Sequence, residues 1–235
     1  MTIERKLLST SPSGDAANVA KVFSVDVWDN EGSSATITSG LDSTDSDVMI
    51  WAKQRDGTGD HYLADTVRGI TKYIRSNTTS AQSTNSDVFA STSSTGYAVG
   101  SILGGSTQSY VGWQFKKKEK FFDIVTWTGN DVAGRQISHS LGSVPAMIIT
   151  KTTSTNPDWK VYHSALGNAK SLKLNQTTAQ AGASVWNSTT PTSTVFTVGS
   201  DGDINSSGRT YVAYLFADNS SELANNQMIK CGSYS

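Results

Sequence analysis

Short runs of alternating or uniformly apolar residues recur along this chain, separated by polar turn-forming residues. The runs are rich in β-branched and aromatic residues, which is typical of strands, and Thr210–Phe216 carries apolar residues toward both faces of a sheet. No segment sustains a 3.6-residue apolar period, so helices are expected only as single turns, at His163–Leu166 and Ser221–Ala224. The predicted strands are Phe23–Trp28, Asp47–Lys53, His61–Asp65, Ile70–Ser76, Tyr97–Ser101, Ser109–Phe115, Phe121–Trp127, Ala146–Lys151, Trp159–His163, Ser171–Asn175, Thr194–Ser200 and Thr210–Phe216.

The whole pattern occurs twice. The segment Val48–Thr79 matches Ala146–Thr178 in step, and the correspondence extends in both directions, pairing Trp28 with Trp127. The offset between matched positions is about 100 residues, which is the size of one small domain and far longer than a solenoid repeat. We therefore expect an all-β protein of two tandem, homologous β-sandwich domains preceded by an extended N-terminal arm. The predicted boundaries are 1–22 for the arm, 23–120 for the first domain and 121–235 for the second.

Two other segments are similar in sequence to the predicted strand that ends at Trp28: the strand that ends at Trp127 and the C-terminal segment 227–235. Three such strands accompany two domains, so we expect one terminal strand to lack a partner within its own domain. An unpaired strand edge is a natural place for another subunit to bind. The predicted assembly residues are Phe23, Val25, Val27, Trp28, Ile229, Cys231 and Tyr234.

The composition of the chain argues against some classes of binding partner. The net charge is −1, which provides no overall field that would attract nucleic acid or an anionic membrane, so neither is expected as a partner. The one cysteine, Cys231, cannot form an intrachain disulfide and is interpreted as a small buried apolar residue. The start of the chain lacks the apolar core of a signal peptide, and no stretch is long enough to span a membrane, which predicts synthesis in a cytoplasm.

The sequence offers little catalytic chemistry. The histidines His61, His139 and His163 are not duplicated in the repeat and do not have zinc-ligand spacing, and no serine lies in a GxSxG frame. A carboxylate pair for glycoside cleavage could be assembled from Asp60 and Asp65, but no motif places them across a cleft. We therefore expect no enzyme activity and no cofactor or metal.

One acidic loop leaves a cation site as an open alternative. Asp201, Asp203 and Asn205 have the alternate spacing of a calcium loop, but position 12 would be Val212 instead of glutamate. A polar turn is the favoured interpretation.

Two matched loops are the candidate sites for contact with a glycan. Asp60 and His61 lie in the first copy, and Asp158 and Trp159 occupy the same places in the second. Most tryptophans have apolar or aromatic partners in the other copy, which favours core packing, whereas Trp159 stands opposite His61. Trp159 is therefore the tryptophan expected at the surface.

Several segments resemble a known family: VMIWAKQRDGTGDHYLADTVRGITKYIRSNTT, WTGNDVAGRQISHSLGSVPAMIITK, DWKVYHSALG, TVFTVGSDGDINSSGRTYVAYLFA and IKCGSYS. They are similar to the tandem repeat domain of uncharacterised function found in tail-fibre-like and other structural proteins of marine bacteriophages and cyanophages. This resemblance implies a virion component that is not an enzyme. It supplies no catalytic residues.

The leading prediction is a non-enzymatic virion structural protein on the particle surface, either a short tail-fibre-like or tail component or a capsid decoration (cement) protein. The expected partners are other capsid or tail proteins and further copies of the chain, with a trimer as the candidate stoichiometry. The alternatives are an adhesin that binds host-surface glycans and, less favoured, a glycan depolymerase.

Overall fold

The structure is a computed structural model that describes residues 18–29, 32–104, 108–177, 179–181, 183–221 and 227–232. These residues form antiparallel sheets joined by turns, so the all-β prediction is confirmed. Helices in the described residues are single turns: η1 (Val19–Lys21), α1 (Ser101–Gly104), η2 (Ser164–Leu166), α2 (Ala183–Trp186) and α3 (Gly202–Asn205). The turn η2 was predicted, whereas most of Ser221–Ala224 lies outside the described residues.

The first half of the chain contributes one large and one small sheet. The large sheet has six strands in the order β1 (Phe23–Asp29), β9 (Ser109–Lys116), β3 (Val48–Gln54), β4 (His61–Asp65), β5 (Lys72–Arg75) and β6 (Ser83–Thr84). The small sheet has the order β2 (Ala35–Ile37), β8 (Gly96–Val99) and β7 (Phe89–Ser93).

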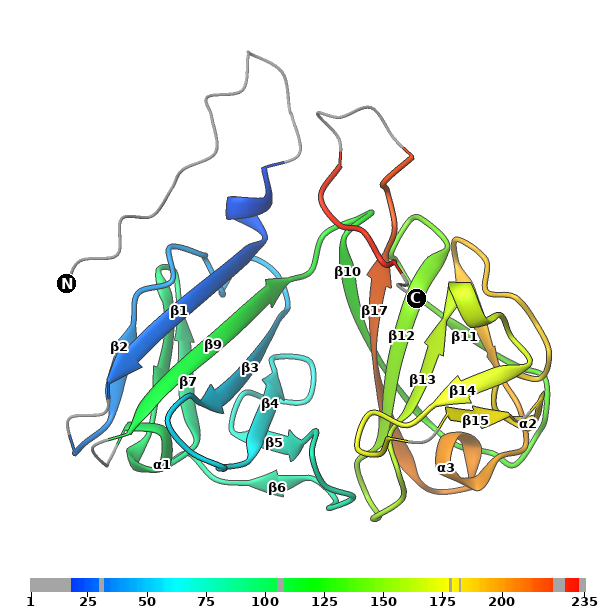
Figure 1. The fold of residues 1–235 in the computed structure, drawn as a ribbon, viewed down its shortest axis with the longest axis horizontal. Helices are drawn as coiled ribbons and strands as arrows, with labels where there is room; N and C mark the ends of the chain where they lie inside the picture. Colours follow the sequence, from blue (N-terminus) through cyan, green and yellow to red (C-terminus); the bar gives the residue numbers. More distant parts are fainter. Residues whose placement is uncertain are drawn as a thin grey trace.

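The second half repeats this arrangement, as Figure 1 shows beside the first half. Its large sheet has the order β10 (Phe122–Thr128), β17 (Thr210–Ala217), β12 (Pro145–Thr152), β13 (Lys160–His163), β14 (Lys170–Leu172) and β15 (Ala179–Ala181). Its small sheet pairs β11 (Arg135–Ser138) with β16 (Val195–Val198). The two large sheets therefore share one strand order, with the strands of the sequence repeat in matching places.

Matched residues make the same contacts in the two halves. Trp28 lies opposite Tyr110 across the β1–β9 ladder, and Trp127 lies opposite Tyr211 across β10–β17. The ring planes of each pair are nearly parallel, at 14° and 12°. Each indole N–H donates to a buried backbone carbonyl, at 2.9 Å and 3.1 Å. The repeat in the sequence is thus a repeat of packing.

Apolar side chains cover both faces of each large sheet. One cluster lies between the two large sheets and contains Met49, Leu63, Phe122 and Phe216. Two further clusters lie on the outer faces, under the small sheets of the first and second halves. This arrangement explains why the central strand β17 is buried along nearly its whole length, since neither of its faces meets water.

The chain ends differ from the prediction. Val22, at the end of the predicted arm, is buried between the halves, and residues 1–17 of that arm lie outside the described residues. The C-terminal strand was predicted wrongly, because residues 227–232 form no strand. Asn219 holds this segment instead: its side-chain oxygen accepts from the backbone N–H groups of Met228 and Ile229 at 3.0 Å. The places beside β9 and β17 are already filled by β1 and β10, so no ladder is open there to a third strand.

Candidate functional site

The predicted glycan loop of the first half is tied down by its own hydrogen bonds. The side chain of Asn77 accepts from the backbone N–H of His61 at 3.1 Å and donates to Asp60 at 2.8 Å. Asp60 also forms an ion pair with Arg75 at 3.3 Å. These contacts fix the entry into β4.

The loop of the second half is built in the same way. Asn175 accepts from the backbone N–H of Trp159 at 3.1 Å and donates to Asp158 at 2.8 Å. Asp158 forms an ion pair with Lys173 at 2.6 Å. The matched residues of the two loops therefore hold turns, which accounts for their recurrence in the sequence.

Trp159 is not a surface residue, and the prediction that placed it there is wrong. Its side chain is fully buried in the cluster between the large sheets. Its indole N–H points to backbone carbonyls of the first half, those of Arg75 at 3.1 Å and Thr78 at 3.2 Å. A buried indole whose N–H is satisfied packs one half against the other and cannot stack on a sugar.

The three histidines each accept a hydrogen bond through Nδ1. The donors are the indole of Trp51 for His61, at 3.3 Å, and the backbone two residues onward for His139 and His163, at 3.3 Å and 3.2 Å. Burial lowers the pKa of His61 and of His139, which favours the neutral rings that these contacts require. The described residues contain no group of three or more side chains that could hold a metal ion.

The acidic loop at Asp201 forms ion pairs with a lysine side chain of the protein. The ammonium of Lys160 lies 3.5 Å from Asp201 and 3.2 Å from Asp203, and the Lys160 side chain is almost fully buried. Asp201 also caps α3, and Asn205 donates to the carbonyls of Val132 and Gly199. These contacts favour the polar-turn interpretation over a calcium site.

The predicted assembly residues on β1 divide into two groups. Trp28 is buried and Phe23 packs on Phe115, with 4.8 Å between ring centroids, so both belong to the cores. Trp28 is therefore corrected from a contact residue to a core residue. Val25 and Val27 are 48% and 56% exposed, on a strand at the end of its sheet.

The C-terminal assembly residues cover the body of the protein. Ile229 packs against the cluster between the large sheets and against the outer cluster of the second half. Cys231 is half-buried against the former, and burial raises the pKa of its thiol to about 11, consistent with the predicted apolar role. Tyr234 lies outside the described residues.

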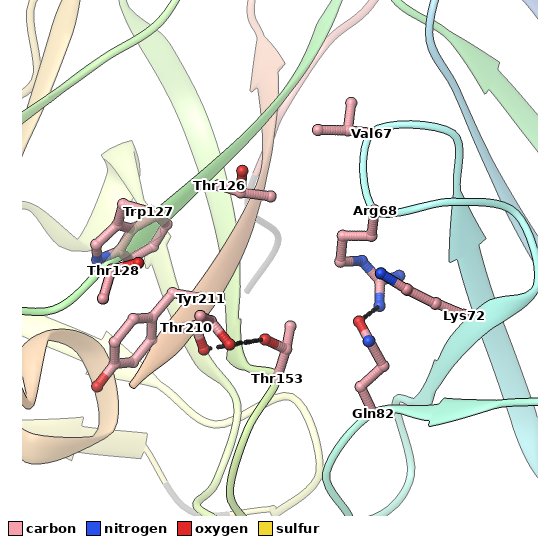
Figure 2. A pocket seen from close by; sticks show the side chains of 10 residues that line it. All are labelled: Val67, Arg68, Lys72, Gln82, Thr126, Trp127, Thr128, Thr153, Thr210 and Tyr211. Carbon is pink, nitrogen blue, oxygen red and sulfur yellow. Dashed lines mark hydrogen bonds between the residues drawn. The ribbon is translucent and has the colours of Figure 1, made fainter. Parts of the chain in front are cut away.

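A pocket opens between the two halves, and no motif in the sequence predicts it. Its volume is about 430 Å³, within the range of small-molecule sites. Figure 2 shows that Arg68, Lys72 and Gln82 project from the first half toward the threonines of the second. The lining residues are Val67, Arg68, Lys72, Gln82, Thr126, Trp127, Thr128, Thr153, Thr210 and Tyr211.

A buried polar network holds the inner wall of this pocket. Arg68 donates through Nε to Asp65 at 2.6 Å, through Nη1 to Gln82 at 2.8 Å and through Nη2 to the Tyr214 hydroxyl at 3.1 Å. That hydroxyl donates to Asp65 at 2.8 Å, and burial raises its pKa well above the ordinary value. Since Tyr214 comes from the second half, the network fixes Arg68 across the interface.

The repeat held an indirect signal for this network. Asp65 stands opposite His163 in the second copy, and Arg68, one residue before the matched Gly69, stands opposite a leucine. A charged residue without a charged counterpart inside a closely matched segment marks a position with a separate role. Sequence spacing could not show that these residues meet Tyr214.

Among the described residues, no helix is long and apolar enough to cross a membrane. No curated protein and no solved structure matches the chain. One protein family matches residues 19–224, which include both large sheets. The chain therefore belongs to the family described as a domain of unknown function (DUF7483).

Proposed function

We propose that this chain is a non-enzymatic bacteriophage virion structural protein that works on the particle surface by binding other virion proteins. It would act as a short tail-fibre-like or tail component or as a capsid decoration protein. In this proposal each half is a β-sandwich domain, a large sheet packed on a small one, and the pair arose by duplication. The resemblance to phage repeat proteins supports the virion assignment.

The exposed valines of β1 carry the proposal. Strand β1 ends its sheet and pairs only with β9 among the described strands, and Val25 and Val27 stand out from it on the same face. Edge strands of soluble proteins are usually protected by charges, and an exposed apolar edge favours pairing with another chain. The matched edge β10 carries a buried Ile124 and a polar Thr126 at these positions, so the apolar row belongs to the first half alone.

The test replaces Val25 and Val27 together by lysine. Because both side chains are exposed, we expect the free energy of unfolding in urea to change by less than about 0.5 kcal/mol per substitution. We expect the oligomer mass measured by light scattering to fall to that of one chain, and incorporation into particles to fall about tenfold or more.

Val132→Lys is the matched control, because Val132 is 58% exposed but lies outside every strand. It should leave oligomer mass and incorporation unchanged. Assembly by the double variant at the level of the unmodified protein would contradict the proposal.

A further inference from the structure

The charged side chains that line the pocket between the halves are positive. Arg68 and Lys72 line it, and no carboxylate among the described residues does. Asp65, which offsets Arg68, is fully buried behind it, and no ion pair of Lys72 occurs in the described part of the chain. The charges of these three residues sum to one positive charge at the pocket.

The polar groups on this wall are arranged as donors. Gln82 uses its carbonyl to accept from Arg68, which leaves its amide N–H₂ to donate. The guanidinium of Arg68 has five N–H groups and donates one to each of its three described partners, so two N–H groups remain for a ligand. The ammonium of Lys72 adds three more. A wall of donors next to positive charge fits an oxyanion.

Hydroxyl groups form the opposite wall. Thr128 on β10 lies directly across from Thr210 on β17, and Thr153 follows β12 beside Thr210, with 2.6 Å between the two hydroxyl oxygens. Thr126 lies two residues before Thr128 on the same face of β10. Thr126 and Thr128 are exposed, and their hydroxyls have no hydrogen-bond partner among the described residues, so they are available to a ligand.

The repeat supplies an internal comparison for this wall. The first half carries Val27 and Asp29 where the second half carries Thr126 and Thr128, and it carries Arg55 where the second half carries Thr153. The framework is otherwise the same, since the backbone bond from Thr153 to Thr210, 2.8 Å, has its counterpart between Arg55 and Ser109, 2.7 Å. The threonine wall is therefore a feature of one half and not of the fold.

We propose that this pocket binds an acidic sugar, a hydroxylated ring that carries one oxyanion. Lys72, Gln82 and the free N–H groups of Arg68 hold the oxyanion, and Thr126 and Thr128 bond the ring hydroxyls. A volume of about 430 Å³ is larger than a bare oxyanion needs, and the hydroxyl wall gives the remainder of the ligand its partners. This site goes beyond the proposed assembly role and involves none of the β1 residues. The two proposals can therefore be tested independently of each other.

The test is a calorimetric titration of the full chain with glucuronate, glucose 6-sulfate, glucose and acetate. We expect one of the two acidic sugars, the carboxylate or the sulfate, to bind at least about tenfold more tightly than glucose and than acetate. The preferred acid identifies the oxyanion. If glucose and both acidic sugars bound with equal affinity, anion recognition would be overturned. If acetate bound as tightly as the acidic sugars, recognition of the sugar ring would be overturned. No detectable binding of either acidic sugar would overturn the site.

Lys72→Met should weaken binding of the preferred sugar about tenfold or more without changing the fold, since Lys72 is exposed. Lys170→Met is the matched control, because Lys170 is exposed at the first position of β14 as Lys72 is of β5. Thr126→Val tests the hydroxyl wall with a residue that the first half accepts at this position, and it should also weaken binding. Unchanged affinity in Lys72→Met and Thr126→Val, or equal losses in Lys72→Met and Lys170→Met, would place the ligand elsewhere.

Discussion

At the scale of single residues, two tyrosines show how the halves differ. Tyr97 and Tyr214 are both fully buried, but the Tyr97 hydroxyl has no hydrogen-bond partner in the described part of the chain, whereas the Tyr214 hydroxyl joins Asp65 to Arg68. The second half carries Phe196 where the first carries Tyr97. A buried hydroxyl contributes to stability only where it is bonded, and costs free energy where it is not.

Removing each hydroxyl should therefore have opposite effects. We expect Tyr214→Phe to lower the free energy of unfolding by about 1–3 kcal/mol, because it takes a hydrogen bond from a buried carboxylate and a buried guanidinium. We expect Tyr97→Phe to be neutral or slightly stabilising. Urea denaturation of both variants at neutral pH makes the comparison, and equal losses in the two would contradict the network described between the halves.

At the scale of elements, strand positions followed from the sequence wherever apolar residues were dense. Strands β1, β3, β9, β10, β12 and β17 lie where the pattern predicted them, because each buries side chains on one or both faces. Short polar strands such as β6 and β15 were missed, since serine, threonine and alanine carry no periodic signal. The C-terminal segment was predicted as a strand because its composition is typical of one, but the edges of β9 and β17 are already paired with β1 and β10.

The loop between β12 and β13 is held by one buried cation. The ammonium of Lys151 donates to the backbone carbonyls of Thr152 at 3.1 Å, Pro157 at 3.0 Å and Thr155 at 3.4 Å. The matched Lys53 makes the same kind of contact in the first half but is only half-buried. Burial lowers the pKa of Lys151 to about 8.

This lowered pKa predicts a dependence of stability on pH. Between a folded-state pKa of about 8 and the unfolded value of 10.5, the unfolded chain binds the proton more strongly, so the contribution of Lys151 to stability rises with pH. We expect the unmodified protein to gain stability relative to Lys151→Met between about pH 7.5 and about pH 9.5. Urea denaturation at both values measures the change in this difference.

If the difference between Lys151→Met and the unmodified protein were constant with pH, Lys151 would not be the buried cation described here.

At the scale of the whole molecule, the two halves form one body. The cluster between the large sheets draws side chains from both, and Trp159 and Tyr214 of the second half bond to groups of the first. The family match spans both halves, in keeping with the pair as the unit. The sequence predicted the duplication, but this interface depends on contacts between residues as far apart as Arg68 and Tyr214, which no local pattern reveals.

Two features of this body are open to binding partners: the exposed apolar row of β1 and the polar pocket between the halves. The first fits a protein partner and the second a small polar ligand. The apolar row of β1 has no matched copy on β10, and the threonine wall of the pocket has no matched copy in the first half.

Electron microscopy of purified particles that carry the chain with a label at its N-terminus tests the proposal that this chain is part of a virus particle. We expect the label at regular positions on the outside of the capsid or tail. Purified particles that contain no labelled chain, while the same cells hold it in soluble form, would contradict the proposed virion role.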